Sequence, residues 1–196
     1  LVALGTLADM MPLVDENRIM VKLGLKSLSE EPRPGLRTLL DKQRLLGKQR
    51  ISSRDIGWTV SPSLNAAGRM GEADKAVRLL MSTDPHEVDV LADEVVQLNQ
   101  KRRTIGDEAW NTVLPQARES FTELGERFVL VQEDSVHRGI TGILAGRLSR
   151  LFSAPAAVIT ASDGRAIGSI RSNRGVRATE LLKACEDLLT EWGGHD

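Results

Sequence analysis

A loop at residues 135–142 has the composition of a phosphate-binding turn. It lies between a predicted strand and a predicted helix, where Gly139 leaves the backbone amides at the start of the helix open to an anion. His137 and Arg138 stand beside this glycine and add positively charged donors. No Gly-Lys-Ser/Thr triplet follows, so the segment is not a P-loop. The alternative interpretation is a simple glycine turn.

A second group of phosphate donors follows in residues 167–175. Side chains alternate along a strand, so Ser169 and Arg171 share one face of the strand predicted there. Ser172 and Arg174 come directly after it. Two hydroxyls and two arginines this close together suit phosphate better than a protein core, because the planar guanidinium pairs with two phosphate oxygens at once. An edge strand with polar side chains facing outward is the alternative.

Two further segments offer oxygen or imidazole ligands. Asp9 ends a short apolar run, and a carboxylate at the carboxyl end of a buried strand is where α/β enzymes place ligands. Such an aspartate could hold Mn²⁺ or Mg²⁺, which prefer oxygen donors, although a helix cap or a turn residue is the alternative. Gly193, Gly194 and His195 form a flexible turn that ends in a donor to phosphate or a metal ligand.

Residues 61–70 contain a run of very small side chains between two polar ones. Ala66, Ala67 and Gly68 allow the backbone to approach a ligand or another element closely. Asn65 and Arg69 flank this run and can each bond to phosphate oxygens. The alternative is a tight junction between a helix and a loop, with the Arg69 side chain extending into solvent.

Several other kinds of site are excluded or disfavoured. The chain holds one cysteine, Cys185, so it has neither a disulfide framework nor a multi-cysteine zinc site, and we expect a reducing, cytoplasmic compartment. No serine, histidine and aspartate stand in a credible catalytic order. With three tryptophans, three phenylalanines and no tyrosine, the chain offers no aromatic platform of the kind that stacks single strands.

Hydrophobic spacing predicts the elements that position these residues. The clearest period runs through residues 88–109 and predicts one helix of roughly 25–30 residues, with Thr83 or Asp84 as its N-cap. Beyond Pro115 the order strand, helix, strand, strand, helix predicts a small α/β layer with its own core. The other predicted elements are a buried strand at 1–7, helices at 17–29, 35–40, 54–59 (capped by Ser53), 71–81, 141–152 and 178–189, and strands at 127–132, 156–160 and 166–171.

The composition is that of an ordinary globular protein with segregated charge. The 196 residues are 41% hydrophobic and 27% charged, with a formal charge of -1, and no apolar run approaches the ~18–20 residues of a membrane span. Residues 136–177 hold seven arginines and one acid, a charge of +6 that is expected at a polyanion site; a solvated face is the alternative. Because the chain begins at Leu1 without a methionine or a basic leader, and stops at Asp196 without a polar tail, we expect a piece of a longer protein.

Taken in order, these segments resemble the DHH phosphoesterases, and in particular their RecJ branch of single-strand-specific 5′→3′ exonucleases. Residues 4–13 resemble the late metal-ligand motif of that family, and residues 64–69 resemble the hallmark of the branch. Segments 139–148, 168–172 and 193–195 follow the order of the DHH-associated domain, and the resemblance covers essentially the whole chain. Two departures are a Val-His-Arg-Gly sequence in place of the usual Trp-His-Pro-Gly, and the absence of the earlier Asp-x-Asp and Asp-His-His metal motifs.

The resemblance implies a two-metal hydrolysis at phosphorus with Mn²⁺ or Mg²⁺. Asp9 would be one metal ligand, and Asn65 and Arg69 would be catalytic residues that hold the scissile or a neighbouring phosphate. The residues that would bind the nucleic-acid backbone without reading its sequence are His137, Gly139, Ser169, Arg171, Ser172, Arg174, Gly193, Gly194 and His195.

The resemblance also implies an α/β fold in three parts. Residues 1–83 would be the C-terminal part of a DHH-type α/β domain, 84–118 a long connector helix, and 119–196 a smaller, truncated DHH-associated domain. The implied function is part of an exonuclease that hydrolyses single-stranded DNA in repair and recombination, with the isolated segment inactive and no membrane involved. A DHH phosphodiesterase acting on short oligonucleotides or cyclic dinucleotides, and a non-catalytic nucleic-acid-binding module, are the alternatives; a single-strand-binding protein or a helicase as partner is left open.

Overall fold

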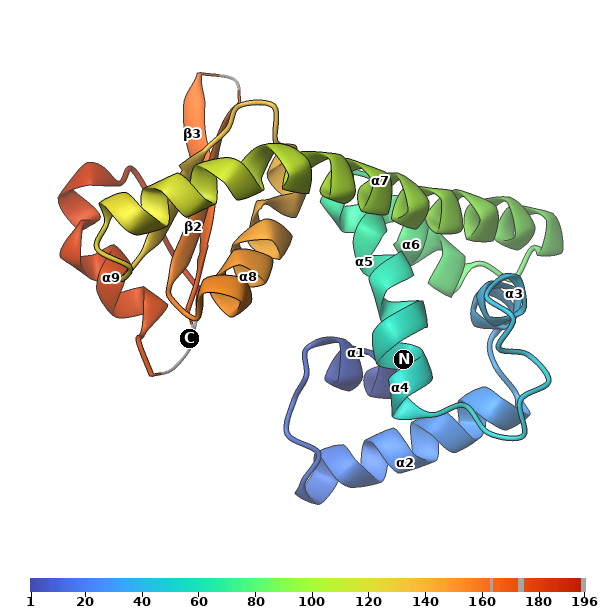
Figure 1. Cartoon of the computed structure of the whole chain (residues 1–196). Helices are drawn as coiled ribbons and strands as arrows, with labels where there is room; N and C mark the ends of the chain where they lie inside the picture. The colour runs from blue at the N-terminus through green and yellow to red at the C-terminus, as the bar shows by residue number, and fades with distance from the viewer. Residues whose placement is uncertain (163, 173–174, 195–196) are drawn as a thin grey trace. The chain divides into compact units, whose positions relative to one another are not determined.

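The computed structural model describes residues 1–162, 164–172 and 175–194, and the chain divides into two compact units, Leu1–Arg102 and Arg103–Asp196 (Figure 1). Each unit has its own packed interior. None of the helices formed by the described residues combines the length and the apolar composition needed to cross a bilayer.

The regular structure of the first unit, all of whose residues are described, is helical. Its hydrophobic core is a cluster of buried aliphatic side chains, contributed by these helices and by the loop before α4. The elements are α1 (Val2–Ala8), α2 (Asp15–Glu30), α3 (Pro34–Lys42), α4 (Ser53–Asp55), the π-helix η1 (Ile56–Val60), α5 (Ser61–Arg69), α6 (Ala73–Met81) and the first part of α7 (Pro85–Glu123).

Two local predictions in this unit are wrong. The apolar run at the N-terminus is helix α1 and not a strand: Ala3 and Leu4 are buried, and Ala3 packs so closely on α2 that a Cβ built on Gly24 would clash with the Ala3 Cβ. The cap of α4 is Ser52 and not Ser53. A capping box needs an acid three residues after the cap, and Asp55 supplies it for Ser52, whose N–H donates to the Asp55 carboxylate at 2.9 Å.

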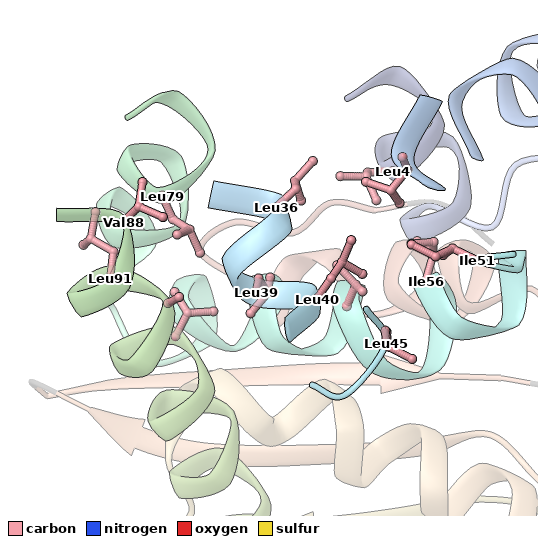
Figure 2. Packing of buried hydrophobic residues seen from close by; sticks show 14 residues of the cluster. Leu4, Leu36, Leu39, Leu40, Leu45, Ile51, Ile56, Leu79, Val88 and Leu91 are labelled. Atoms are coloured by element: carbon pink, nitrogen blue, oxygen red, sulfur yellow. The ribbon is translucent and has the colours of Figure 1, made fainter. Parts of the chain in front are cut away.

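The aliphatic cluster of the first unit is centred on α3 and extends to α6 and α7 on one side and to α1, α2 and η1 on the other. In Figure 2, Leu39 lies on the side of α3 toward α6 and α7, whereas Leu40 lies on the side toward Leu45 and Ile56. The backbones of α3 and α6 are in contact, because a Cβ at Gly35 would clash with the Leu79 carbonyl oxygen. This packing holds α5 and α6 in place, and with them the polar residues of α5.

Helix α7 is longer than the sequence predicts, with 39 residues from Pro85 to Glu123. Of the two N-caps predicted for it, Asp84 is the one that the structure uses, since the Asp84 Oδ1 accepts the His86 N–H at 2.9 Å. Lys42 ties the first turns of the helix to α3, because its Nζ lies 2.8 Å from a carboxylate oxygen of both Asp89 and Asp93. The hydrogen bonds to these two carboxylates raise the pKa of Lys42 above its ordinary value.

The described residues of the second unit form a three-stranded mixed sheet covered by α8, and the predicted α/β class is confirmed. The strand order is β1-β2-β3. Strand β1 runs parallel to β2, and β2 runs antiparallel to β3. A parallel pair needs a crossover, and α8 provides it between β1 and β2. The elements are β1 (Val129–Gln132), the 3-10 turn η2 (Arg138–Ile140), α8 (Thr141–Phe152), β2 (Ala156–Ser162), β3 (Arg165–Arg171), α9 (Ala178–Ala184) and the 3-10 turn η3 (Glu186–Leu188).

The last part of α7 belongs to this second unit and covers β1. The Ser120 Oγ of α7 accepts the Leu130 N–H at 3.0 Å on the outer edge of β1. Elsewhere on α7, the Trp110 ring lies under the Arg147 guanidinium of α8, with the Arg147 Cζ 3.8 Å from a ring centroid. This cation–π contact joins α7 to the helix that carries the candidate site.

Candidate nucleic-acid interface

The loop before α8 is closed by its own histidine. The His137 Nδ1 accepts the Gly139 N–H at 3.0 Å, and the His137 carbonyl oxygen accepts the Ile140 N–H at the same distance. His137 therefore caps the 3-10 turn that leads into α8. The sequence predicted an open Gly139 amide, whereas the structure uses this amide to fix the shape of the loop.

Ser169 of β3 lies against the first residue of α8. Its Oγ is 2.9 Å from the Oγ1 of Thr141, and the Thr141 Oγ1 also donates to the Arg138 carbonyl at 3.1 Å. A threonine hydroxyl has one proton, so Ser169 is the donor of the shared hydrogen bond whenever that proton goes to Arg138. The pair anchors β3 to the start of α8.

Arg171 follows two residues later on the same face of β3 and runs along α8. A Cβ built on Gly142 would lie 3.1 Å from the Arg171 Nη2 and 3.4 Å from the Ser169 Oγ. One turn further, a Cβ on Gly146 would lie 3.8 Å from the Arg171 Cγ. The two glycines therefore form a groove for the arginine, and its guanidinium lies at the N-terminal end of the helix, where the Nη1 donates to the Ile170 carbonyl at 2.7 Å.

This placement brings two positive features together. The amide end of a helix carries a partial positive charge, so a guanidinium beside it is repelled unless an anion lies between them. Among the described residues no carboxylate lies within ion-pair distance of Arg171, whose side chain is exposed. Helix amides and a planar guanidinium together suit an oxyanion such as phosphate.

Two residues of this site were not predicted from the sequence as site residues, Thr141 and Gly142. Thr141 is buried at the base of the site, and Gly142 gives the Arg171 guanidinium its space. The signal was the spacing of Gly142 and Gly146, since glycines four residues apart leave one face of a helix flat.

The remaining predicted contacts of the C-terminal half follow β3 in the chain. Ser172 is half-buried directly after β3. Gly193 and Gly194 lie in an exposed irregular segment, where a Cβ on either would meet nothing within 4 Å in the part of the chain that the structure describes. The predictions for Arg174 and His195 fall outside the described residues.

Asn65 and Arg69 share the exposed face of α5. They are four residues apart on a helix, which places them one above the other. The small residues between them lie within the helix and not in an open loop. Ala66 and Ala67 are fully buried, so they allow the helix to approach other elements closely, which is one of the two uses expected from the sequence.

Asp9 is exposed and follows α1, so it does not end a strand. No group of three or more histidine, cysteine, aspartate or glutamate side chains that could hold a metal ion occurs among the described residues. A two-metal centre needs several such ligands. The residues present therefore do not fit such a centre by themselves, and Asp9 could supply one ligand of it.

Comparison with known proteins shows that the chain is similar to a group of nucleases. Residues 125–196 match the DHHA1 domain family. The chain is 38% identical over 203 residues to the single-stranded-DNA-specific exonuclease RecJ of Bacillus subtilis, an alignment that includes 100% of this chain and 25% of that protein. It is 34% identical over 195 residues to the RecJ of Thermus thermophilus, with 100% of this chain and 27% of that protein. The chain thus spans about a quarter of the length of these curated relatives.

Two solved structures are similar to the chain. The crystal structure of RecJ from Thermus thermophilus in complex with Mg²⁺ matches 99% of this chain and 29% of that one, with a TM-score of 0.86 and 34% identity. A crystal structure of an exonuclease RecJ bound to manganese matches 99% of this chain and 47% of that one, with a TM-score of 0.77 and 32% identity.

Proposed function

Because this chain is RecJ-like along its whole length and has a DHHA1 domain at residues 125–196, we propose that it is the DNA-binding segment of a single-strand-specific exonuclease. The whole protein would hydrolyse phosphodiester bonds from the 5′ end of single-stranded DNA, in repair and recombination. Within the segment, we assign residues 1–83 to the end of the catalytic domain, 84–118 to the connector helix, and 119–196 to the DNA-binding domain.

The observation that carries this proposal is the position of Arg171, a residue of β3 whose guanidinium lies beside the first turn of α8. Arg171 and the α8 amides both favour a negative charge at one place, and Ser169 stands beside them. A phosphate there receives a bidentate pair from the guanidinium. Contacts of this kind position a strand without reading its bases, as a nuclease that accepts any sequence requires.

The segment would contribute to hydrolysis through the first unit. Related structures contain Mg²⁺ or manganese, ions that activate a water and stabilise the oxygens at phosphorus. We assign Asp9 as one ligand of such a centre, and Asn65 and Arg69 as the residues that hold the adjacent phosphate from the exposed face of α5. The other ligands would have to come from outside the described residues, so no hydrolytic step is assigned to them.

The test is a binding titration at several salt concentrations. The 196-residue chain is titrated into a labelled oligothymidine, and the anisotropy gives Kd at each salt concentration. Arg171→Ala should weaken binding about equally for oligothymidine, oligoadenine and mixed strands, and should lower the salt slope by roughly 0.7, the value for one phosphate contact on a single strand. Arg171→Lys should restore part of the affinity, because an ammonium lacks the bidentate geometry.

Arg165→Ala is the matched control. It removes an exposed arginine from the other end of the same strand, away from Gly142. Arg165→Ala should change both the affinity and the salt slope less than Arg171→Ala does. Equal losses for the two variants would show that only the net charge matters, and an unchanged slope for Arg171→Ala would remove the phosphate assignment.

A further inference from the structure

The elements α4, η1 and α5 form one continuous helical segment (Figure 1). A row of exposed side chains follows one face of this segment. Arg54, Trp58, Asn65 and Arg69 are exposed, with the half-buried Pro62 between them. The successive intervals, counted through Pro62, are four, four, three and four residues, which is the spacing of one helix face. The structure thus places an aromatic ring in line with the two polar residues assigned to phosphate.

The π-helical turn improves this alignment. In a regular α-helix of about 100° per residue, the row would drift by about 60° between Arg54 and Arg69. In η1 the Ser61 N–H bonds to the Ile56 carbonyl five residues back, and the wider turn rotates each residue by less. The drift is thereby reduced. Single π turns within helices occur frequently at functional sites.

The opposite side of the segment is firmly packed. Ile56, Val60, Ala66 and Ala67 are fully buried, which fixes the orientation of the exposed row. Trp58, in contrast, is 77% exposed and is the one aromatic residue in residues 1–102. The interior of this unit is aliphatic, so the indole contributes little to its packing.

The charges beside Trp58 favour a polyanion. Arg54 lies one turn before Trp58, and among the described residues no carboxylate lies within ion-pair distance of its guanidinium. Arg69 is the next arginine along the row. An exposed indole between two arginines combines a flat stacking surface with phosphate donors, which is how proteins bind single strands without sequence preference.

We propose that Trp58 stacks on one base of single-stranded DNA, a single contact and not the platform of aromatic side chains that the composition excludes, and that Arg54 contacts the backbone beside that base. The proposal rests on the function proposed above and extends the DNA contact to a second place on the chain. Every base offers a π face, so the contact tolerates any sequence. If the Trp58 indole binds a segment of protein instead of a base, the proposal is wrong.

The test combines fluorescence with binding. Addition of oligothymidine to the whole chain should quench tryptophan emission, and Trp58→Phe should keep Kd within about twofold while the part of the quenching due to Trp58 disappears. Trp58→Ala should weaken binding about fivefold or more, the low end of the range for loss of one stacked base. Val77→Ala is the matched control, since it truncates another exposed apolar side chain of the same unit, 59% exposed, and should bind like the parent chain.

An abasic strand of equal length separates stacking from charge. Stacking predicts that Trp58→Ala and the parent chain bind this strand equally, whereas Arg54→Gln weakens binding to both strands. The proposal is overturned if Trp58→Ala binds oligothymidine like the parent chain, or if it loses the same factor on the abasic strand. In either case Arg171→Ala still reports on the proposed function, because that residue belongs to the second unit.

Discussion

The two glycines beneath Arg171 should respond in opposite ways to the addition of one methyl group. A Cβ at Gly146 lies 3.6 Å from the Arg150 Nη1 and 3.8 Å from the Arg171 Cγ, which are ordinary contact distances. Gly146→Ala therefore keeps the arginine in place and gains helix propensity, up to about 1 kcal/mol. At Gly142 the Cβ lies 3.1 Å from the Arg171 Nη2, so the guanidinium must move by a few tenths of an ångström.

This movement should weaken binding and leave the fold intact. The crowded atom is the end of a flexible side chain, so Gly142→Ala should unfold no earlier than the parent chain. Displacement of the guanidinium from the α8 amides should raise Kd for oligothymidine by about three- to tenfold, which is roughly 0.7–1.4 kcal/mol. Gly146→Ala should leave Kd unchanged and raise Tm by a few degrees.

Anisotropy titration and thermal denaturation of the three proteins measure both effects. The contrast between the variants is decisive because both add the same group to the same helix. If Gly142→Ala binds like the parent chain, the guanidinium does not hold phosphate at the start of α8. If Gly146→Ala loses as much affinity, the loss comes from the helix in general and the geometry of the groove is irrelevant.

Three further predictions concern the first unit. The purified chain with Mn²⁺ should leave labelled single-stranded DNA intact, because its described residues hold no metal-binding cluster; release of nucleotides that Asp9→Ala abolishes would contradict this. In a longer RecJ-like protein that contains this segment, Asp9→Ala should abolish hydrolysis and retain DNA binding. The hydrogen bonds from Lys48 and then Ser52 lower the pKa of Asp55 to about 2, so their stabilisation is present above about pH 4 and is lost as the pH falls toward 2. Urea unfolding at about pH 6 and about pH 3 should show about 1 kcal/mol of this loss after solvent screening, and Asp55→Asn should lack it; equal pH dependence of the two proteins would refute the assignment.

Most elements of the second unit could be predicted because their signals are local, although the helix predicted at 178–189 ends at Ala184 and is followed by the 3-10 turn η3. The helix at 141–152 agrees with α8 at both ends, and the strands are each bounded by turn residues. The first seven residues could not be assigned this way, since a short apolar run fits a buried strand as well as a buried helix. The helix is favoured by the close packing of Ala3 against Gly24 of α2. This is a tertiary contact, which a local pattern of residues does not reveal.

The site shows the same division between local and long-range information. Alternation along β3 predicted that Ser169 and Arg171 share a face. It could not predict that this face meets Gly142, because that depends on the pairing of β3 with β2 and on the crossover by α8. Nor could composition distinguish Trp58 from the other tryptophans, since its exposure follows from which face of the η1–α5 helix packs inward.

The bond between Ser120 and Leu130 also bears on self-association of the chain. A strand at the edge of a sheet presents unpaired N–H and C=O groups, which can recruit a strand from another molecule. On β1 this edge is covered, because the Leu130 N–H already donates to the Ser120 hydroxyl. The other edge strand, β3, begins and ends with an arginine, Arg165 and Arg171. Two antiparallel copies of β3 would set these like charges opposite each other, so the arginine that we assign to phosphate also discourages the growth of sheets between molecules.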